Sequence, residues 1–597
     1  MSDSPEASYF GPPDRPLFGW LHAPGAGSRA PLGLVICNPF GYESICAHRT
    51  LRDTAIAAAD AGIWTLRFDY DGTGDSSGSD TDPARLRAWL DSIHHAIDFL
   101  RARAAVAQIA LFGIRMGAAL ATLAAVERSD VDGVIAFAPA LNGRAYLREM
   151  RALQLATGLA PAASDAGDTE ATGFVLTAET QRTVAGIDLR ALEQLPARNI
   201  LILDRDDLSG SDAWAERLRT LGATVELARV HGFVEMMQSP HSTIVPLQMV
   251  TRAIRWVSSR ASVLRLAESV AEASSGVSAM PAAYASDMTS ARLSASSVVE
   301  RVCRIGDSRE LFGILATSDT LPSPQAGVIL LNAGATHHIG PNRLYVTLAR
   351  QLAARGMAVL RMDVSGIGDS PPRAGEKPNV VYSRRAGEDL CCAIDCLRRT
   401  TGVTRCFALG LCSGAYHALK GSLAGALLDS LVMINPLTFY WHDGMSLDAK
   451  MPAQWVIAES SRYQQTFFRL APWIKLLKGE VDIRNILSVF SLRAGTTLKY
   501  SLRDVARQLR IPLKNDLGRE LTLISGRGIG LTFVFSRGDP GFDLLRIEGG
   551  SPIRKLLRRG RMQVHVIDAA DHTFTPRLAR EQLQSLVIRE FERLGVA

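Results

Sequence analysis

A ten-residue stretch in the C-terminal half constrains this chain more than any other. Residues 407–416 read F-A-L-G-L-C-S-G-A-Y, an apolar run that leads through Gly410, Cys412 and Gly414 into small residues. The apolar run is typical of a buried strand, and the residues after it favour the start of a helix. Glycines two residues either side of the cysteine avoid a clash with the backbone. The pattern predicts a sharp strand-to-helix turn with Cys412 at its tip.

A turn of this kind carries the nucleophile in the α/β-hydrolase fold, where the residue is usually serine. The strained turn would lift the Cys412 side chain clear of the sheet. The N-terminus of the following helix would favour the thiolate over the thiol. A structural turn with no catalytic role is the alternative for this pattern.

The plan of the chain is duplicated. Residues 34–38 match residues 328–332, and the D-G-T-G-D-S segment ending at Ser76 recurs as S-G-I-G-D-S, in both cases 294 residues later. Residues 110–118 match the turn around Cys412 at an offset of 297. In both halves, short apolar runs alternate with longer amphipathic stretches. This rhythm predicts two tandem α/β-hydrolase domains, each with a mostly parallel sheet flanked by helices.

Composition shifts suggest where the domains begin and end. We expect an N-terminal domain over residues 1–262, an Ala/Ser-rich linker over 263–296 and a C-terminal domain over 297–597. Each domain carries an insertion, at about 144–198 and 442–520, between the elbow and the acid. In this fold such an insertion forms a cap over the active site; a helical excursion packed elsewhere is the alternative.

Composition also excludes several classes of function. A net charge of +6 over 597 residues is too small to imply nucleic-acid binding. No apolar run approaches the roughly 18 residues of a membrane span, and the N-terminus lacks a secretory signal, so a cytoplasmic location is expected. Cys391, Cys392 and Cys396 lack a second ligand pair, so we expect no metal and no cofactor. The oligomeric state is left open.

Two residues after Cys412 complete a candidate catalytic triad. In the α/β-hydrolase fold the acid and the histidine follow the nucleophile in that order. Asp539 and His572 each follow an apolar run that reads as a strand. His572 would accept the Cys412 proton and later protonate the leaving group, while Asp539 would orient and stabilise the imidazole. Asp543 and Asp571 are the alternatives for the acid.

An oxyanion hole needs two backbone N–H groups beside the nucleophile. One is expected from Ser413, directly after the nucleophile, and the other from Gly334 or Ala335 in the loop after the matching strand. His337 and His338 lie in the same loop, and we expect them to shape it rather than to act in catalysis.

The N-terminal half lacks a nucleophile at its matching position. Arg115 stands where the C-terminal half has Cys412, and a guanidinium cannot attack a carbonyl. Asp207 and His231 follow in the order of an acid and a histidine. We therefore expect a degenerate site in which Arg115 forms an ion pair with Asp207 or Asp206. The alternative is that Arg115 binds a carboxylate or a phosphate in a retained pocket.

Several motifs together resemble the tandem or paired α/β-hydrolases of bacterial exosortase and exopolysaccharide gene clusters. The first half carries P-F-G-Y-E-S-I-C-A-H-R-T (residues 39–50) and R-F-D-Y-D-G-T-G-D-S. The second carries N-A-G-A-T-H-H-I-G-P-N-R (residues 332–343) and L-C-S-G-A-Y-H-A. In the wider superfamily, Cys-Asp-His versions include dienelactone hydrolases, bile-acid-CoA amino-acid acyltransferases and polyester synthases.

A cysteine nucleophile favours acyl transfer from a thioester. Attack by sulfur on a thioester exchanges one thioester for another, and the acyl-Cys412 formed could then acylate an amine or a hydroxyl. We therefore expect an acyltransferase or thioesterase that uses an acyl-CoA or an acyl-carrier protein, with a second acceptor molecule possible. An ester or lactone hydrolase of the dienelactone type and a catalytically silent scaffold are the alternatives.

Overall fold

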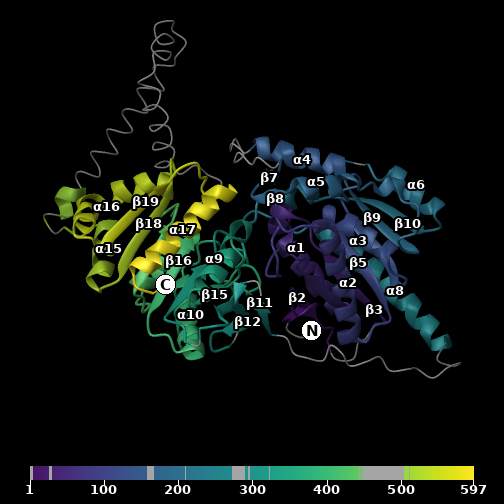
Figure 1. Ribbon diagram of the computed structural model, residues 1–597, viewed down its shortest axis with the longest axis horizontal. Coiled ribbons are helices and arrows are strands. Elements are labelled where there is room, and N and C mark those ends of the chain that lie inside the picture. Colours follow the sequence, from purple (N-terminus) through teal and green to yellow (C-terminus); the bar gives the residue numbers. More distant parts are fainter. Residues whose placement is uncertain are drawn as a thin grey trace, which may run out of the picture.

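The computed structural model places the chain in two α/β units that lie side by side (Figure 1). It describes residues 5–25, 30–156, 167–271, 289–447 and 503–596, apart from positions 209, 294–295, 309, 322, 443, 446, 508 and 510. Each unit is built on one large, mostly parallel sheet with helices on both faces, which confirms the predicted fold class.

The N-terminal sheet has eight strands in the order β1-β2-β4-β3-β5-β6-β9-β10. β2 pairs antiparallel with β1 and β4, and the pairs from β4 to β10 are parallel. The strands are β1 (Glu6–Phe10), β2 (Leu17–His22), β3 (Leu32–Cys37), β4 (Trp64–Phe68), β5 (Gln108–Ile114), β6 (Val131–Phe137), β9 (Asn199–Arg205) and β10 (Thr224–Val230). The helices around this sheet are α1 (Gly41–Asp60), α2 (Arg85–Ala104), α3 (Met116–Val126), α6 (Asp212–Thr220), α7 (Phe233–Met237) and α8 (Leu247–Ala271).

The C-terminal sheet repeats this plan with one added edge strand. Its order is β11-β12-β13-β15-β14-β16-β17-β18-β19, and without β11 it is the order of the first sheet. The strands are β11 (Ser290–Leu293), β12 (Val298–Ile305), β13 (Leu311–Ser318), β14 (Ala326–Leu331), β15 (Met357–Met362), β16 (Cys406–Leu411), β17 (Ser430–Ile434), β18 (Gly530–Ser536) and β19 (Met562–Ile567). The helices are α9 (Leu344–Ala353), α10 (Ala386–Thr401), α11 (Ser413–Leu423), α15 (Leu517–Gly526), α16 (Pro540–Arg558) and α17 (Arg577–Arg593), and a 3-10 turn, η3 (Pro341–Arg343), precedes α9.

The central strands are buried on both faces, because each parallel sheet is covered by helices on both sides. All six residues of β16 are buried, and alternate side chains enter different cores. Cys406 and Ala408 belong to one apolar cluster, whereas Phe407, Leu409 and Leu411 belong to the cluster on the opposite face. This packing fixes the end of β16, and with it the position of the turn at Cys412.

The insertion of the N-terminal half lies between β6 and β9. It contains α4 (Gly143–Ala156), β7 (Thr169–Ala171), β8 (Phe174–Leu176), α5 (Ala178–Ala185) and a 3-10 turn, η1 (Leu189–Ala191). It reaches the C-terminal half, because the carbonyl of Gly173 accepts a hydrogen bond of 2.9 Å from Arg580 in α17. The expected insertion at 442–520 falls largely on residues 448–502, which lie outside the described residues.

The linker expected over 263–296 is wrong at both of its ends. Helix α8 runs to Ala271, and β11 at Ser290–Leu293 pairs antiparallel with β12. Alanine and serine, which made the stretch look like a linker, are compatible with a helix end and an edge strand. Among the described helices, none has the length and apolar character needed to cross a bilayer.

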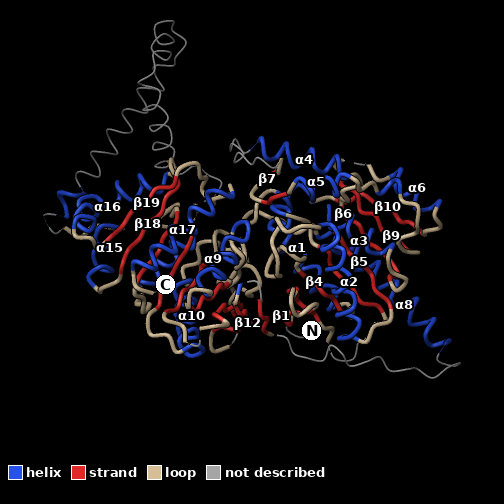
Figure 2. The backbone as a smooth tube through the Cα atoms, viewed as in Figure 1, coloured by secondary structure: helices blue, strands red, loops and turns tan. Residues whose placement is uncertain are grey.

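The two halves meet through matching surfaces. The β1 edge of one sheet lies beside the β11–β12 edge of the other (Figure 2). Arg67 forms an ion pair with Asp369, and Arg361 forms one with Asp75. Arg361 lies 294 positions after Arg67, and Asp369 lies 294 positions after Asp75. Each half therefore gives the other the same arginine and the same aspartate. The interface therefore has the reciprocal form of a two-fold dimer within one chain.

A buried histidine joins the two halves. The Nε2 atom of His338 lies 2.6 Å from the Asp75 carboxylate of the N-terminal half, and its Nδ1 atom lies 2.8 Å from Asp363 of its own half. Burial would lower the pKa of His338, but the charges of Asp75 and Asp363 raise it to about 10. At neutral pH this side chain is therefore an imidazolium between two carboxylates.

This imidazolium predicts a pH dependence of stability. Because the pKa of His338 is higher in the folded chain than in the unfolded one, its contribution is complete below about pH 6.5 and is lost as the pH rises through about 10. His338→Gln should lower the free energy of unfolding by about 3 kcal/mol at neutral pH, because it leaves Asp75 and Asp363 without their shared cation. Urea unfolding of both proteins between pH 6 and 10 should show this difference shrinking.

His565→Gln, on the last strand, is the matched control and should leave the pH profile as it is in the parent protein. A difference between parent and His338→Gln that stays constant over this pH range would contradict a buried imidazolium at the interface.

Candidate active site

The backbone at Cys412 makes the predicted sharp turn between β16 and α11. Cys412 has φ 56° and ψ −112°, a sparsely populated conformation that costs roughly 1–3 kcal/mol. A Cβ atom on Gly410 would lie 2.1 Å from the carbonyl carbon of Gly414, and one on Gly414 would lie 2.6 Å from the Leu331 carbonyl oxygen. Only glycine fits at these two positions, so the sequence pattern reports a real steric requirement.

The candidate acid and base meet beyond the ends of β18 and β19. Asp539 caps α16, and its carboxylate accepts a hydrogen bond of 2.8 Å from the Gly541 N–H. The other carboxylate oxygen lies 2.7 Å from Nδ1 of His572. These strands are parallel to β16, so their carboxyl ends share the sheet edge that carries Cys412.

The Nε2 atom of His572 is positioned for proton transfer. It is buried and has no hydrogen-bond partner among the described residues. Burial would lower the pKa of His572, but the charge of Cys412 and the hydrogen bond to Asp539 raise it well above its ordinary value of 6.5. The structure therefore brings Cys412, His572 and Asp539 together in one electrostatic unit. Asp571 instead accepts a hydrogen bond of 2.6 Å from the Thr575 N–H within its own loop.

The loop that follows β14 approaches the start of α11. The Gly334 N–H donates to the Ser413 hydroxyl at 3.0 Å, and this hydroxyl donates to the Asn332 carbonyl at 3.3 Å. The Gly334 N–H is therefore already engaged in this structure. Ala335 is half-buried against the aromatic cluster beside Cys412, which leaves it as the stronger of the two loop candidates for an oxyanion donor.

Tyr382 is a residue of this site that sequence reasoning missed. Its hydroxyl lies 3.9 Å from the Cys412 sulfur, and its ring stacks on Trp441 with centroids 4.3 Å apart. Burial and the charge of Cys412 raise the pKa of Tyr382 well above 10, so it stays a neutral phenol. Tyr382 and Trp441, with Tyr416 edge-on at 5.2 Å, form an aromatic wall beside the sulfur.

Asn435 is a second residue that the sequence did not reveal. It follows β17, and its side-chain amide donates to the His572 carbonyl at 2.7 Å. The amide oxygen accepts a hydrogen bond of 2.9 Å from the Ser536 N–H, at the end of the strand that leads to Asp539. Asn435 thus connects the loop of the histidine to the loop of the acid.

The degenerate site in the N-terminal half is built differently from the prediction. Arg115 keeps the elbow conformation, with φ 56° and ψ −120°. Its guanidinium, however, binds Glu43 of α1 at 2.8 Å and also Glu149 of α4. The expected ion pair of Arg115 with Asp207 or Asp206 is therefore wrong. Two carboxylates, one from α1 and one from α4, thus already balance the charge of this arginine.

The predicted acid and histidine of this half lie elsewhere. Asp207 forms an ion pair with Arg205 at 2.5 Å. Asp206, not Asp207, lies 2.5 Å from Nδ1 of His231, which reproduces the contact between Asp539 and His572. The side chain of His231 is 77% exposed, so this acid–histidine pair stands in water without a nucleophile.

Several solved structures resemble part of the chain at low identity. Est1E from Butyrivibrio proteoclasticus, with ferulic acid bound, is 21% identical and covers 43% of this chain and 99% of its own, with a TM-score of 0.35. XC6422 from Xanthomonas campestris, described as an a/b serine hydrolase without lid, is 17% identical and covers 39% of this chain and 85% of its own, with a TM-score of 0.26. Protein PA2218 from Pseudomonas aeruginosa is 18% identical and covers 42% of this chain and 93% of its own, with a TM-score of 0.31.

Among curated proteins, none matches the chain closely enough to count as a relative. The family described as serine aminopeptidase, S33, matches residues 47–184 and 323–496, together more than half of the chain. The matched segments lie in both halves, as the duplicated sheets require. The chain belongs to the serine aminopeptidase S33 family of α/β hydrolases.

Proposed function

We propose that this α/β hydrolase is an acyltransferase or thioesterase that forms an acyl thioester on Cys412. The observation that carries the proposal is the His572 imidazole, held by Asp539 at 2.7 Å on Nδ1 and near enough to Cys412 for the charge of that sulfur to raise the pKa of His572. The raised pKa of His572 favours an imidazolium beside a thiolate, the resting pair of a cysteine nucleophile.

The first half-reaction moves the acyl group from the substrate to the enzyme. The Cys412 thiolate attacks the carbonyl carbon of an acyl-CoA or acyl-carrier-protein thioester, and the carbonyl electrons move to the oxygen. The N–H groups of Ser413 and Ala335 stabilise this oxyanion. When the tetrahedral intermediate collapses, the bond to the departing sulfur breaks, and His572 gives its proton to the leaving thiolate.

The second half-reaction releases the acyl group. An amine, a hydroxyl or water attacks acyl-Cys412, and His572 takes the proton of the attacking group as the bond to Cys412 breaks. Transfer and hydrolysis differ only in this nucleophile. The motifs shared with exosortase-associated hydrolases support a role in bacterial polysaccharide or secondary-metabolite biosynthesis, where a sugar or an amine would accept the acyl group.

The thioester substrate is favoured over a plain ester for an energetic reason. Exchange of one thioester for another leaves the type of bond unchanged, so acyl-Cys412 forms with little change in free energy. Conversion of an oxygen ester into the acyl-Cys412 thioester would instead cost free energy. The aromatic wall of Tyr382, Tyr416 and Trp441 offers an apolar surface for the acyl chain beside the sulfur. An ester or lactone hydrolase of the dienelactone type is the second candidate, because the same triad geometry serves it.

The proposal predicts a covalent adduct. The parent protein incubated with acyl-CoAs of increasing chain length should gain the mass of one acyl group, measured as intact mass after acid quenching. Cys412→Ala should gain none, and Cys392→Ala, on α10, should behave like the parent. His572→Ala should slow adduct formation by about 100-fold or more, because the proton transfers lose their catalyst.

Discharge of the adduct separates transfer from hydrolysis. Faster loss of the acyl mass with an added amine or sugar than with water alone indicates a transferase, and equal loss indicates a thioesterase. If no thioester or ester gives an adduct or turnover, both enzymatic functions are ruled out and the scaffold alternative remains.

A further inference from the structure

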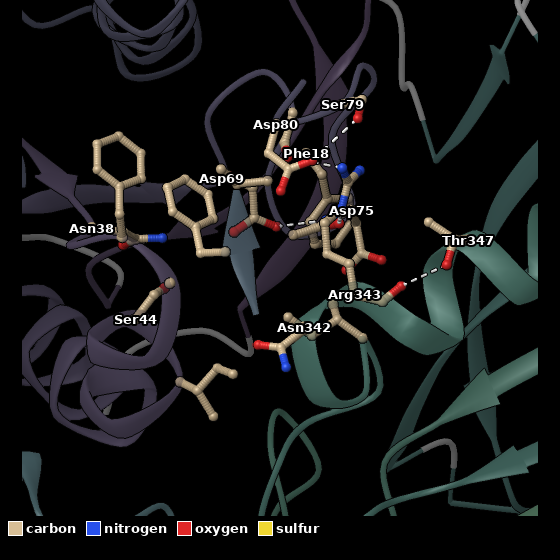
Figure 3. Close-up of a pocket in the computed structure, with 18 of the residues that line it drawn as sticks. Phe18, Asn38, Ser44, Asp69, Asp75, Ser79, Asp80, Asn342, Arg343 and Thr347 are labelled. Carbon is tan, nitrogen blue, oxygen red and sulfur yellow. Dashed lines mark hydrogen bonds between the residues drawn. The ribbon is translucent and has the colours of Figure 1, made fainter. Parts of the chain in front are cut away.

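A cavity of about 360 Å³ lies between the two halves (Figure 3), and the proposed catalytic residues are not among those that line it. Its walls come from the loops after β3 and β4, from β8 and from the loop that precedes α9, together with α9 and α17. Neither Cys412 nor Arg115 lines it. A volume above roughly 300 Å³ is in the range of sites for small organic ligands.

The carboxylate of Asp69, at the wall of this cavity, forms no direct ion pair with any described residue, although the charges of His48 and His338 act on it. Among the described residues, this carboxylate accepts one hydrogen bond, of 2.9 Å, from the backbone N–H of Asp75. Arg67, two residues earlier, is committed to Asp369. Arg343 donates to the carbonyl oxygens of the loop at residues 72–78 rather than to a carboxylate.

The matching residue in the C-terminal half shows what is missing. Asp363 lies 294 positions after Asp69 and accepts the same backbone hydrogen bond, here 2.9 Å from the Asp369 N–H. Asp363 also accepts hydrogen bonds of 2.7 Å from the side-chain amide of Asn332 and from the backbone N–H of His338. Its other carboxylate oxygen lies 2.8 Å from Nδ1 of the His338 ring. Asp363 thus has a buried cation in direct contact, whereas Asp69 borders a cavity and has no such direct partner among the described residues.

Two neighbours of Asp69 differ from their counterparts in the C-terminal half. Ser44 stands at the position that matches His338, and this short side chain lines the cavity. Asn38 matches Asn332, but its amide oxygen is buried without a hydrogen-bond partner among the described residues, whereas the Asn332 oxygen accepts a bond of 2.8 Å from the Val364 N–H. The half-buried Asp69 therefore borders the cavity as an acceptor without a direct cationic partner among the described residues.

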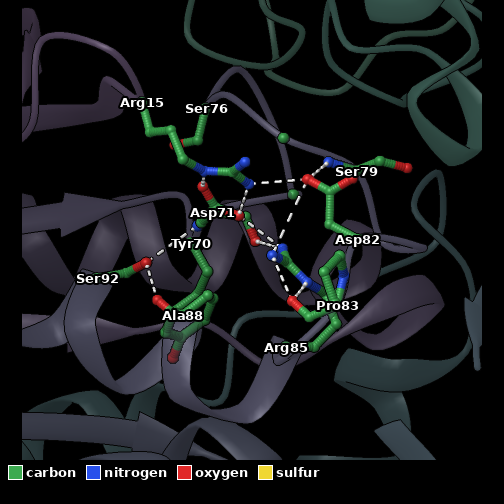
Figure 4. Close-up of polar contacts among 12 residues, drawn as sticks. Arg15, Tyr70, Asp71, Ser76, Ser79, Asp82, Pro83, Arg85, Ala88 and Ser92 are labelled. Carbon is green, nitrogen blue, oxygen red and sulfur yellow. Dashed lines mark hydrogen bonds and ion pairs between the residues drawn. The ribbon is translucent and has the colours of Figure 1, made fainter. Parts of the chain in front are cut away.

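The wall that carries Asp69 is held in place before any ligand arrives. Asp71 forms ion pairs of 2.6 Å with both Arg15 and Arg85, and Arg15 also binds Asp82 at 2.8 Å (Figure 4). These contacts brace the loop after β4 from behind. A preformed wall lowers the entropic cost of binding.

We propose that this cavity binds a small organic amine, with its ammonium group on Asp69 and its body against Phe40 and Phe174. The ammonium would take the role that the His338 imidazolium has beside Asp363. The rings of Phe40 and Phe174 are stacked with centroids 5.7 Å apart and provide the apolar surface that such a ligand needs next to its charge. Burial and the nearby Asp75 raise the pKa of Asp69 to about 6, against the charges of His48 and His338, which lower it.

Matched pairs of probes test the proposal. Glucosamine and glucose differ in one ammonium group, as do cyclohexylmethylamine and cyclohexylmethanol, and calorimetric titration of the full-length protein compares them. In at least one pair the amine should bind ten times more tightly or better than its neutral partner. Equal binding within both pairs, or no binding of either amine, would overturn the proposal.

Two substitutions locate the binding. Asp69→Asn keeps an acceptor for the Asp75 N–H and should abolish the preference for the amine, while Asp91→Asn on the exposed face of α2 should retain it. Ser44→Lys places a tethered ammonium in the cavity and should block the amine without lowering the melting temperature. Unchanged amine affinity in Asp69→Asn, with an unchanged melting temperature, would contradict the assignment. Cys412→Ala should bind as the parent does, which separates this site from the proposed catalysis.

Discussion

The backbone conformation at Cys412 is the constraint on which the candidate site depends. The turn from β16 into α11 brings Gly410 and Gly414 so close to neighbouring backbone that neither can carry a side chain. It forces the residue between them to positive φ, and the buried strand below it, with all six residues covered, prevents the turn from relaxing. The packing of the sheet maintains this strained backbone. The turn places the Cys412 sulfur at the N-terminus of α11, on the side of His572.

The first half keeps the same turn, but its tip carries an arginine instead of a nucleophile. Arg115 adopts almost the same φ and ψ as Cys412, yet it is neutralised by Glu43 and Glu149. The first half instead supports the second. Its Asp75 holds His338, three residues after Ala335, so the loop proposed to supply an oxyanion donor is fixed by a charge from the other half. The first half can thus position the loop proposed to supply the oxyanion donor without supplying a residue to the proposed triad.

Sequence reasoning was most successful where the fold itself dictates position. Parallel strands bring their carboxyl ends to one edge, so the order of Cys412, Asp539 and His572 along the chain places them at the same sheet edge, while their catalytic roles stay a prediction. It failed for Arg115 because Glu43 and Glu149 come from helices whose packing against the elbow has no sequence signature. Tyr382 and Asn435 lie in loops without a motif, and only the coordinates show that one approaches the sulfur and the other joins two loops. The reciprocal ion pairs between the halves were equally hidden, since a repeat in sequence does not say how its copies dock.

The most direct test of the account is the reactivity of the Cys412 sulfur. Iodoacetamide at pH 6.5 to 7, followed by peptide mapping, compares it with Cys391 and Cys392, half-buried thiols whose pKa burial raises. The account predicts that Cys412 is alkylated at least ten times faster than either, and that His572→Ala removes this advantage while the other two thiols react as before. Alkylation of Cys412 no faster than that of Cys391 and Cys392, or a rate unchanged in His572→Ala, would contradict it.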